Sequence, residues 1–203
     1  MRTRNTTAAY GLVSILLHWS IALTVIALFM LGLWMVELDY YDAWYRRAPD
    51  LHKSIGILLF IAVLLRILWH ALSKRPAPLG SGREVMLARL VHRILLILPL
   101  LVMFSGYLIS TADGSSIDVF SLFSVPATIS GIEGQEDIAG EVHFVLAVAL
   151  IAIAALHMLA ALKHHFIDGD TTLKRMLGFV AGSGDGDGYG CLSRLLASLF
   201  YAF

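Results

Sequence analysis

The sequence has few charged residues and almost no cysteine. Only 15% of its 203 residues are charged and 58% are hydrophobic, whereas a soluble domain carries about 25% charged residues. The formal net charge is zero, so no excess of positive charge indicates a nucleic-acid partner. Cys191 is the single cysteine, which excludes a disulfide within the chain. These shortages indicate a membrane protein rather than a soluble domain.

Charged residues are absent or nearly absent from four long apolar stretches. About 20 apolar residues are needed to cross a bilayer as a helix, and four segments meet that length: 11–36, 52–72, 91–112 and 142–162. Because lipid offers no hydrogen bonds to the backbone, each segment is expected to be helical. We therefore predict an all-α, integral membrane four-helix bundle. The first segment lacks the cleavage pattern of a signal peptide and is expected to be retained.

Lysine and arginine are missing from the 113–141 connection, which is acidic instead. They occur at the N-terminus, in the 73–90 connection and after the fourth apolar segment. Since cytoplasmic loops of membrane proteins are enriched in lysine and arginine, both chain termini of the bundle domain and the 73–90 connection are expected on the cytoplasmic side. The 37–51 and 113–141 connections are then expected on the outer side.

Four of the eight histidines pair by depth in the predicted bundle. His143 and His157 are fourteen residues apart, so they leave the same face of one helix about 21 Å apart along its axis. His52 is level with His143 near the outer side, and His18 is roughly level with His157 near the cytoplasmic side. The spacing thus predicts two layers with two histidines each.

Two facing imidazoles per layer match bis-histidine ligation of a haem iron. We therefore predict two b-type haems at two depths, which would form an electron path across the bilayer. Structural zinc is disfavoured because it prefers four ligands, often including thiolates. A proton relay through the histidines is an alternative, since ionisable residues inside membranes are usually functional. Any single histidine is also compatible with a purely structural role.

Two further residues are expected near the inner haem. Arg66 follows His52 by fourteen residues and so lies on the same face, about 21 Å deeper. Its guanidinium is predicted to pair with a haem propionate, and snorkelling to the lipid headgroups is the alternative. His92 is predicted at the start of the third helix, where it would bond a propionate or cap the interface. Gly56, by contrast, lies near the outer layer on the same helix face as His52, where it would let a flat macrocycle approach the backbone.

The residues around these histidines resemble a known family. The matching stretches are LLHWSIA around His18, DLHKSIGILL around His52, GYLISTADG at 106–114 and VHFVLAVALIAIAALHMLAALKHHFIDGDTTLKRM at 142–176. Over roughly residues 8–178 the sequence resembles the bacterial di-haem cytochrome b561 family, in particular its YceJ-like branch. The resemblance does not extend to residues 179–203.

The resemblance implies a cofactor arrangement and a function. His52 and His143 would hold the outer haem, and His18 and His157 the inner one. Such proteins are multi-pass proteins of the bacterial inner membrane that move electrons between the quinone pool and a periplasmic donor or acceptor. One branch oxidises superoxide and reduces ubiquinone, so an oxidoreductase of that type is one expectation. Substrate or quinone contacts are expected at Lys53, His164 and Lys174.

Several expectations stay open on the sequence alone. Residues 1–178 are predicted to form the cytochrome domain, and 179–203 a Gly/Asp-rich linker with a short amphipathic tail. The main alternative function is a cytochrome b membrane-anchor subunit that relays electrons for a dehydrogenase or hydrogenase. A haem-free, proton-coupled transporter is a third. Partners are the bilayer, a membrane quinone, a periplasmic redox protein and, as an open option, a second copy of the chain.

Overall fold

The computed structural model describes residues 3–74 and 76–179. The described residues form five helices, with one small β-hairpin between the third helix and the fourth. In chain order they are α1 (Leu12–Met35), α2 (Arg47–Leu72), α3 (Gly82–Ser110), β1 (Ile117–Val119), β2 (Phe123–Val125), α4 (Gln135–Phe166) and α5 (Thr172–Met176).

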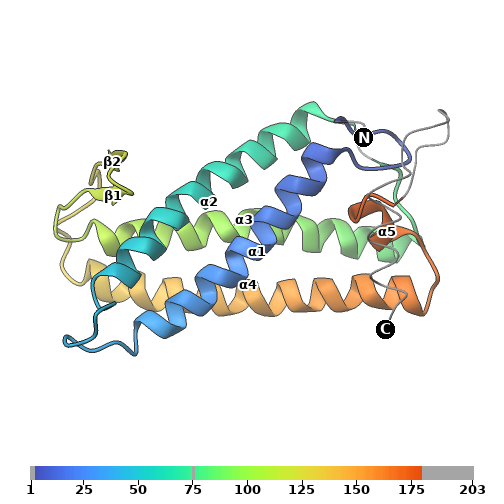
Figure 1. Ribbon diagram of the computed structural model, residues 1–203. Helices are drawn as coiled ribbons and strands as arrows, with labels where there is room; N and C mark the ends of the chain where they lie inside the picture. Colours follow the sequence, from blue (N-terminus) through green and yellow to red (C-terminus); the bar gives the residue numbers. More distant parts are fainter. Residues whose placement is uncertain (1–2, 75, 180–203) are drawn as a thin grey trace.

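The four long helices form two packed pairs. α1 packs against α2 and α3 against α4 along much of their lengths, whereas α1 and α4 touch only briefly (Figure 1). Each of the four is long and apolar enough to cross a membrane. The prediction of an all-α, four-helix membrane bundle is therefore confirmed.

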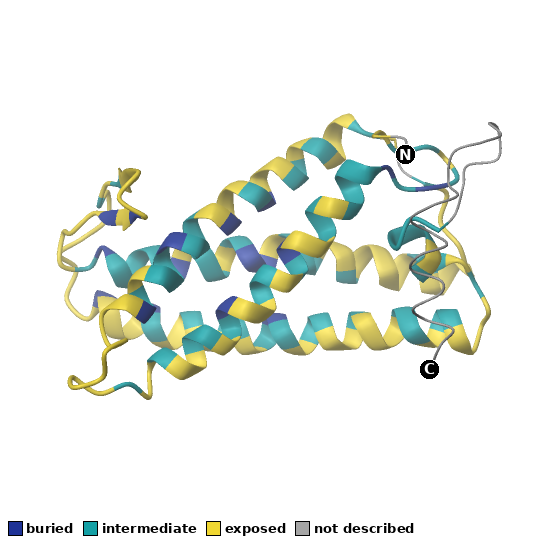
Figure 2. Cartoon of the chain, viewed as in Figure 1, coloured by how far each residue is buried: buried dark blue, intermediate teal, exposed yellow. Residues whose placement is uncertain are grey.

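The outer faces of the bundle are apolar and exposed, as lipid-facing surfaces must be. Leu23 of α1 is 62% exposed and Leu159 of α4 is 57% exposed, and exposed positions run along all four helices (Figure 2). The buried cluster is small and is centred on Ile21 and Leu28 of α1 with Leu59 of α2. Lipid, rather than water, is the medium in which such a surface is stable.

α3 begins at Gly82 rather than at the predicted position 91. The Glu84 side chain accepts a hydrogen bond of 2.7 Å from the backbone N–H of Ser81, which is half of a capping box. The residues that follow, including Met86 and Ala88, are good helix formers. A search for uncharged stretches misses this start, because the first turns of α3 carry charge. His92 consequently lies well inside α3 instead of opening it.

α4 also begins earlier than predicted, at Gln135 instead of 142. Gly134 has φ 69°, a left-handed conformation that glycine adopts readily. The Gln135 side chain donates a hydrogen bond to the carbonyl of Leu108 (2.9 Å), which fixes the helix start against the end of α3. His143 therefore lies two turns into α4. α2 likewise begins at Arg47, so His52 lies inside it.

The long acidic connection contains a two-stranded antiparallel hairpin that the sequence analysis did not predict. β1 and β2 pair with Val119 opposite Phe123. Phe120 and Ser121 both have positive φ, 51° and 56°, as the turn of a tight hairpin requires. Ser54 of α2 holds this turn, because its hydroxyl lies 3.3 Å from both the Asp118 carbonyl and the Phe120 amide nitrogen.

The two ends of the bundle differ in what covers them (Figure 1). We call the end with β1 and β2 and the 36–46 connection the hairpin end. We call the end with residues 3–11, 73–74, 76–81 and 167–179 the terminal end. Hydrogen bonds tie the terminal end together: Trp19 donates to the carbonyl of Met176, and Arg175 donates to that of Ala77. The predicted linker and tail lie, apart from Phe179, outside the described residues.

Candidate haem-binding site

The structure brings His52 of α2 and His143 of α4 together near the hairpin end. Their ring centroids are 6.2 Å apart. Imidazole nitrogens bind metal ions at about 2 Å, so two imidazoles on opposite sides of one ion have centroids roughly 6 Å apart. The two rings also come from different helix pairs. Their spacing therefore fits two imidazoles that would hold one iron.

Hydrogen bonds from α3 fix the protonation of the His143 ring. Its Nδ1 lies 2.9 Å from the carbonyl oxygen of Val102 and 3.2 Å from the hydroxyl of Ser105. A carbonyl oxygen only accepts hydrogen bonds, so Nδ1 must carry the proton. Nε2 is then unprotonated and keeps its lone pair for a metal. Hydrogen bonds of this kind orient most metal-binding histidines.

A glycine lies directly behind each of these two rings. A Cβ atom on Gly106 of α3 would come within 3.0 Å of Cε1 of His143, and one on Gly32 of α1 within 3.3 Å of Cε1 of His52. We call Gly32 and Gly106 the glycine seats of the two histidines. Each helix pair thus supplies one histidine and the glycine behind it. The sequence analysis did not identify either glycine. Gly56, which it named for the approach of a macrocycle, has open space within 4 Å of its Cβ position and stays a prediction.

The two rings differ in their hydrogen bonding. His143 Nδ1 has two oxygen neighbours, whereas His52 Nδ1 is buried and has no hydrogen-bond partner among the described residues. Ser105, which contacts His143, is itself only 4% exposed. The sequence feature that could have revealed this contact is the pair of small residues Ser105 and Gly106 within an apolar helix, because small residues mark the close approach of a neighbouring helix.

The second set of histidines lies towards the terminal end and is arranged differently. The ring of His157 lies 5.1 Å, centroid to centroid, from that of His92 on α3. His18 of α1 makes no ring contact with His157 among the described residues, although the two interact electrostatically. The structure therefore gathers the predicted inner pair in one region without bringing the two rings face to face.

Arg66 lies in this same region, on α2. Its guanidinium is 3.2 Å from Nδ1 of His18. Because a guanidinium only donates hydrogen bonds, His18 Nδ1 is the acceptor and its proton is on Nε2. Ligation of iron through Nε2 would need that proton to move to Nδ1 and Arg66 to turn to another acceptor. A haem propionate is such an acceptor, as predicted for Arg66 from the sequence.

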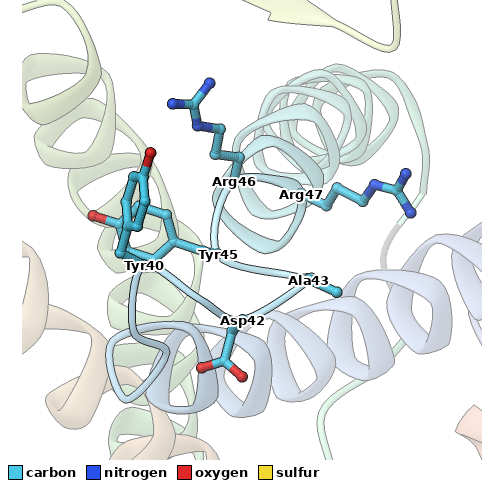
Figure 3. Close-up of a pocket in the computed structure, with 6 residues that line it drawn as sticks. All are labelled: Tyr40, Asp42, Ala43, Tyr45, Arg46 and Arg47. Carbon is cyan, nitrogen blue, oxygen red and sulfur yellow. The ribbon is translucent and has the colours of Figure 1, made fainter.

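Cationic side chains lie around the start of α2 at the hairpin end. A pocket of about 350 Å³ is lined by Tyr40, Asp42, Ala43, Tyr45, Arg46 and Arg47. The two arginines point away from each other and the two tyrosines gather at its other side (Figure 3). Lys53 lies one residue beyond His52 and pairs with Asp50 at 2.9 Å. Lys53, which was predicted to contact a substrate or quinone, thus lies next to His52 but is paired with the Asp50 carboxylate.

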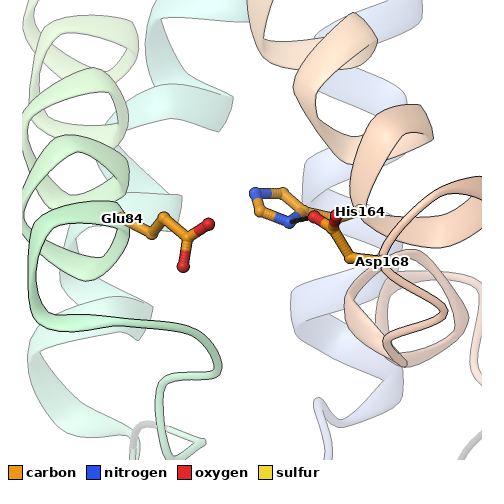
Figure 4. A group of neighbouring side chains, drawn as sticks. All are labelled: Glu84, His164 and Asp168. Atoms are coloured by element: carbon orange, nitrogen blue, oxygen red, sulfur yellow. Dashed lines mark ion pairs between the residues drawn. The ribbon is translucent and has the colours of Figure 1, made fainter.

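Polar side chains gather at the end of α4, near the terminal end. His164 Nδ1 is 2.7 Å and Lys163 Nζ 2.8 Å from the same Asp168 oxygen. The hydrogen bonds from Lys163 and then His164 hold the pKa of the Asp168 carboxyl below its ordinary value. Glu84 of α3 lies across from them (Figure 4). Lys163 and His164 already pair with Asp168, and Glu84 accepts a hydrogen bond from Ser81, so we assign no metal here. Lys174 is exposed on α5.

Known proteins resemble this chain over most of its length. The family model of prokaryotic cytochrome b561 matches residues 9–179. The chain belongs to this family. It is 50% identical over 180 residues to cytochrome b561 homolog 2 of Escherichia coli strain K12, covering 88% of this chain and 96% of that protein. It is 30% identical over 175 residues to the probable superoxide oxidase CybB of Yersinia pestis, covering 83% of this chain and 95% of that one.

Membership of the cytochrome b561 family gives this multi-pass membrane protein its general role. The family implies b-type haem and electron transfer across the membrane. The residues fit that cofactor at the hairpin end, where the tautomer of His143 leaves its Nε2 free for a metal and the two rings are spaced to share one ion.

Proposed function

We propose that the protein carries electrons between the membrane quinone pool and a donor or acceptor on the periplasmic side. His52 and His143 would hold one haem b, and His18 and His157 a second. The observation that carries the proposal is the 6.2 Å spacing of the His52 and His143 rings together with the Nδ1 hydrogen bond of His143. The two histidine layers lie about 21 Å apart along α4. Electrons would pass between the two haems on their way across the membrane.

The side chains have separate tasks in this proposal. When bound, a haem b held by two imidazoles supplies one-electron transfer and offers a substrate no open position on the iron. His143 would be a fixed ligand, because α3 holds its tautomer and its orientation. Arg66 would pair with a propionate and place a positive charge near the inner haem. His92 would support His157, whose ring it contacts.

The terminal end suits a quinone that gains protons. His164 is oriented by Asp168, which is exposed to water beyond the end of α4. Quinone reduction needs two electrons and two protons, and His164 could pass protons from this side. Lys174 is on the same end, as α5 packs against α4. We therefore place the quinone contacts at His164 and Lys174, on the cytoplasmic side of the bacterial inner membrane.

The hairpin end would exchange electrons with the periplasmic partner. Superoxide is one candidate, because one relative is a probable superoxide oxidase. Two superoxide ions would each give up one electron and leave as dioxygen, and one quinone would take the two electrons with two protons. Arg46, Arg47 and Lys53 would attract the anion. The acidic side chains of the 113–141 connection oppose this attraction, so a periplasmic redox protein is the competing partner.

The direct test is the haem content of the purified protein and of two histidine variants. Spectra of the oxidised and reduced protein and a pyridine haemochrome assay are expected to give two haems b per chain. His52→Ala and His143→Ala should each lose one haem, and the same one. His165→Ala is the matched control, because the His165 ring packs against Phe166 at the end of α4, and it should keep both. A full haem content in either ligand variant would contradict the pairing.

The quinone assignment needs a second measurement. His164→Ala is expected to keep both haems but to slow haem reduction by an added ubiquinol analogue. The same purified protein serves to distinguish superoxide from a soluble protein as the periplasmic partner. Rapid haem reduction by superoxide supports the first, and co-purification of a soluble redox protein supports the second.

A further inference from the structure

The two imidazoles at the hairpin end have unequal environments, although each rests on a glycine seat. The Nδ1 proton of His143 points into a triangle of close polar atoms. Nδ1 is 2.9 Å from the Val102 carbonyl oxygen and 3.2 Å from Ser105 Oγ, and Ser105 Oγ donates to the same carbonyl at 2.8 Å. Ser105 donates its only hydroxyl hydrogen to the Val102 carbonyl, so the lone pairs of its oxygen can accept the Nδ1 proton of His143. The proton thus has two acceptors.

His52 has no such arrangement. Its Nδ1 is buried against α1 and lacks a hydrogen-bond partner among the described residues. Its glycine seat, Gly32, allows the ring to lie against the backbone but offers it no acceptor side chain. The electronic difference between the two rings therefore comes from α3, through Val102 and Ser105.

The hydrogen bond on Nδ1 controls how strongly an imidazole donates electrons to a metal. When an acceptor draws the Nδ1 proton, the ring gains negative character and binds the more positive, ferric iron better. Two acceptors do this more than one does. Hydrogen bonds around axial ligands are one of the means by which proteins set haem potentials.

We propose that Ser105 is a positioning residue that lowers the reduction potential of the haem held by His143. It acts by sharing the Nδ1 proton of His143 with the Val102 carbonyl. The inference rests on the proposed function, because it takes His143 as an axial ligand. It goes beyond that function by assigning the potential of one haem to a single hydroxyl on a helix that supplies neither of its ligands.

The test is the midpoint potential of each haem in the purified Ser105→Ala protein, followed by the absorbance of the reduced haems. We expect a full haem content, an upward shift in the potential of one haem and no shift in the other. The low-spin ferric electron paramagnetic resonance signal of the same haem should change as well. An unchanged or lower potential with both haems present overturns the proposal.

Three further variants make the outcome decisive. Ser54→Ala removes an equally buried hydroxyl that bonds the hairpin backbone instead of an imidazole, and it should leave both potentials in place. Ser105→Thr keeps the hydroxyl and should restore the wild-type potential. If Ser105→Ala loses the haem, Ser105→Cys replaces it as the test. A cysteine variant with both haems and an unshifted potential overturns the proposal, and one with an upward shift supports it.

His143→Ala separates this inference from the proposed function. If His143→Ala keeps both haems, the ligand assignment is wrong and the role of Ser105 falls with it. If His143→Ala loses one haem while Ser105→Ala leaves its potential unchanged, only the role of Ser105 is wrong.

Discussion

At the scale of single residues, each of the two imidazoles at the hairpin end lies against a glycine of the other helix in its pair. The helical repeat places His143 and His157 on one face whatever the neighbours are, and His52 then meets His143 by depth. Glycines in apolar helices have several uses, from helix packing to cofactor contact. The prediction for Gly56, the approach of a macrocycle, stays a prediction, and the sequence analysis did not identify Gly32 and Gly106 as the glycine seats of the rings. Their role depends on which helices are neighbours, which a single sequence does not state.

The glycine seat at Gly106 gives a residue-scale prediction. In Gly106→Ala the new Cβ would meet Cε1 of His143 at 3.0 Å and Nδ1 at 3.2 Å, so the ring must move off its hydrogen bond with Val102. We expect loss of one haem from most of the purified protein, measured by pyridine haemochrome. Gly32→Ala, with a contact of 3.3 Å to His52, should have a smaller effect.

Gly82→Ala is the control for the change from glycine to alanine, since it lies on the same helix with nothing within 4 Å of its Cβ position. It should keep the full haem content. Equal haem content in Gly106→Ala and Gly82→Ala would show that the His143 ring does not need this space.

Arg66 gives a second residue-scale prediction. Its depth followed from the sequence, but its contact with His18 did not, because a long flexible side chain can reach several partners. Arg66→Gln removes a positive charge beside the His18 layer and should lower the potential of the inner haem. A unit charge about 10 Å away shifts a one-electron potential on the order of 50 mV.

Potentiometry of both haems is the measurement for Arg66→Gln, with Arg89→Gln as the control because Arg89 is exposed on α3. If the two variants behave alike, Arg66 serves the membrane surface rather than the haem.

At the scale of elements, the spans were predictable in number and type but not in their bounds. Apolar windows end at the first charged residues, whereas α3 and α4 begin with charged turns held by Glu84 and Gln135. The β1–β2 hairpin was not predicted, because strands of three residues are too short to show an alternating pattern. Its position on α2 depends on Ser54, a polar residue buried inside a predicted span.

Ser54 gives an element-scale prediction. Ser54→Ala removes the hydroxyl that joins α2 to the hairpin turn at Asp118 and Phe120. Loss of a buried hydrogen bond of this kind should reduce the free energy of unfolding by about 0.5–1.5 kcal/mol. The measurement is thermal unfolding in detergent, together with limited proteolysis within 113–134. Ser20→Ala is the control, as the Ser20 hydroxyl bonds carbonyls of its own helix.

At the scale of the whole molecule, charge separates the two ends, and this asymmetry was visible in the sequence. Lysine and arginine concentrate near the terminal end, and acidic residues near the hairpin end. The contacts that give the terminal end its shape were not visible, because Trp19, Arg175 and Asp168 find partners far away or in loops. The separation of charge was therefore predictable, and the closure of that end was not; the orientation in the membrane stays a prediction.

The terminal end gives a pH prediction. Hydrogen bonds from Lys163 and His164 lower the pKa of Asp168 from its ordinary value of 3.8. A carboxyl whose pKa is lower in the folded state stabilises that state above its unfolded pKa, and this stabilisation is lost as the pH falls through the folded pKa. We expect part of the stability loss below about pH 4 to disappear in Asp168→Asn.

Thermal unfolding in detergent, from about pH 3 to about pH 7, measures this effect. Lys163→Met should mimic Asp168→Asn, because Lys163 is the main cause of the pKa change. If both variants keep the wild-type acid profile, Asp168 has no part in stability at the terminal end.

The division of the bundle into two helix pairs has a consequence for assembly. α1 with α2, and α3 with α4, each bury their own contacts, while the rings of His52 and His143 face each other across the boundary. A haem bound by both rings would link the two helix pairs, which are the two halves of the bundle, and its binding free energy would stabilise their association. Loss of the iron porphyrin should therefore loosen the junction of the two halves, which would then rest on the packing of α2 against α3.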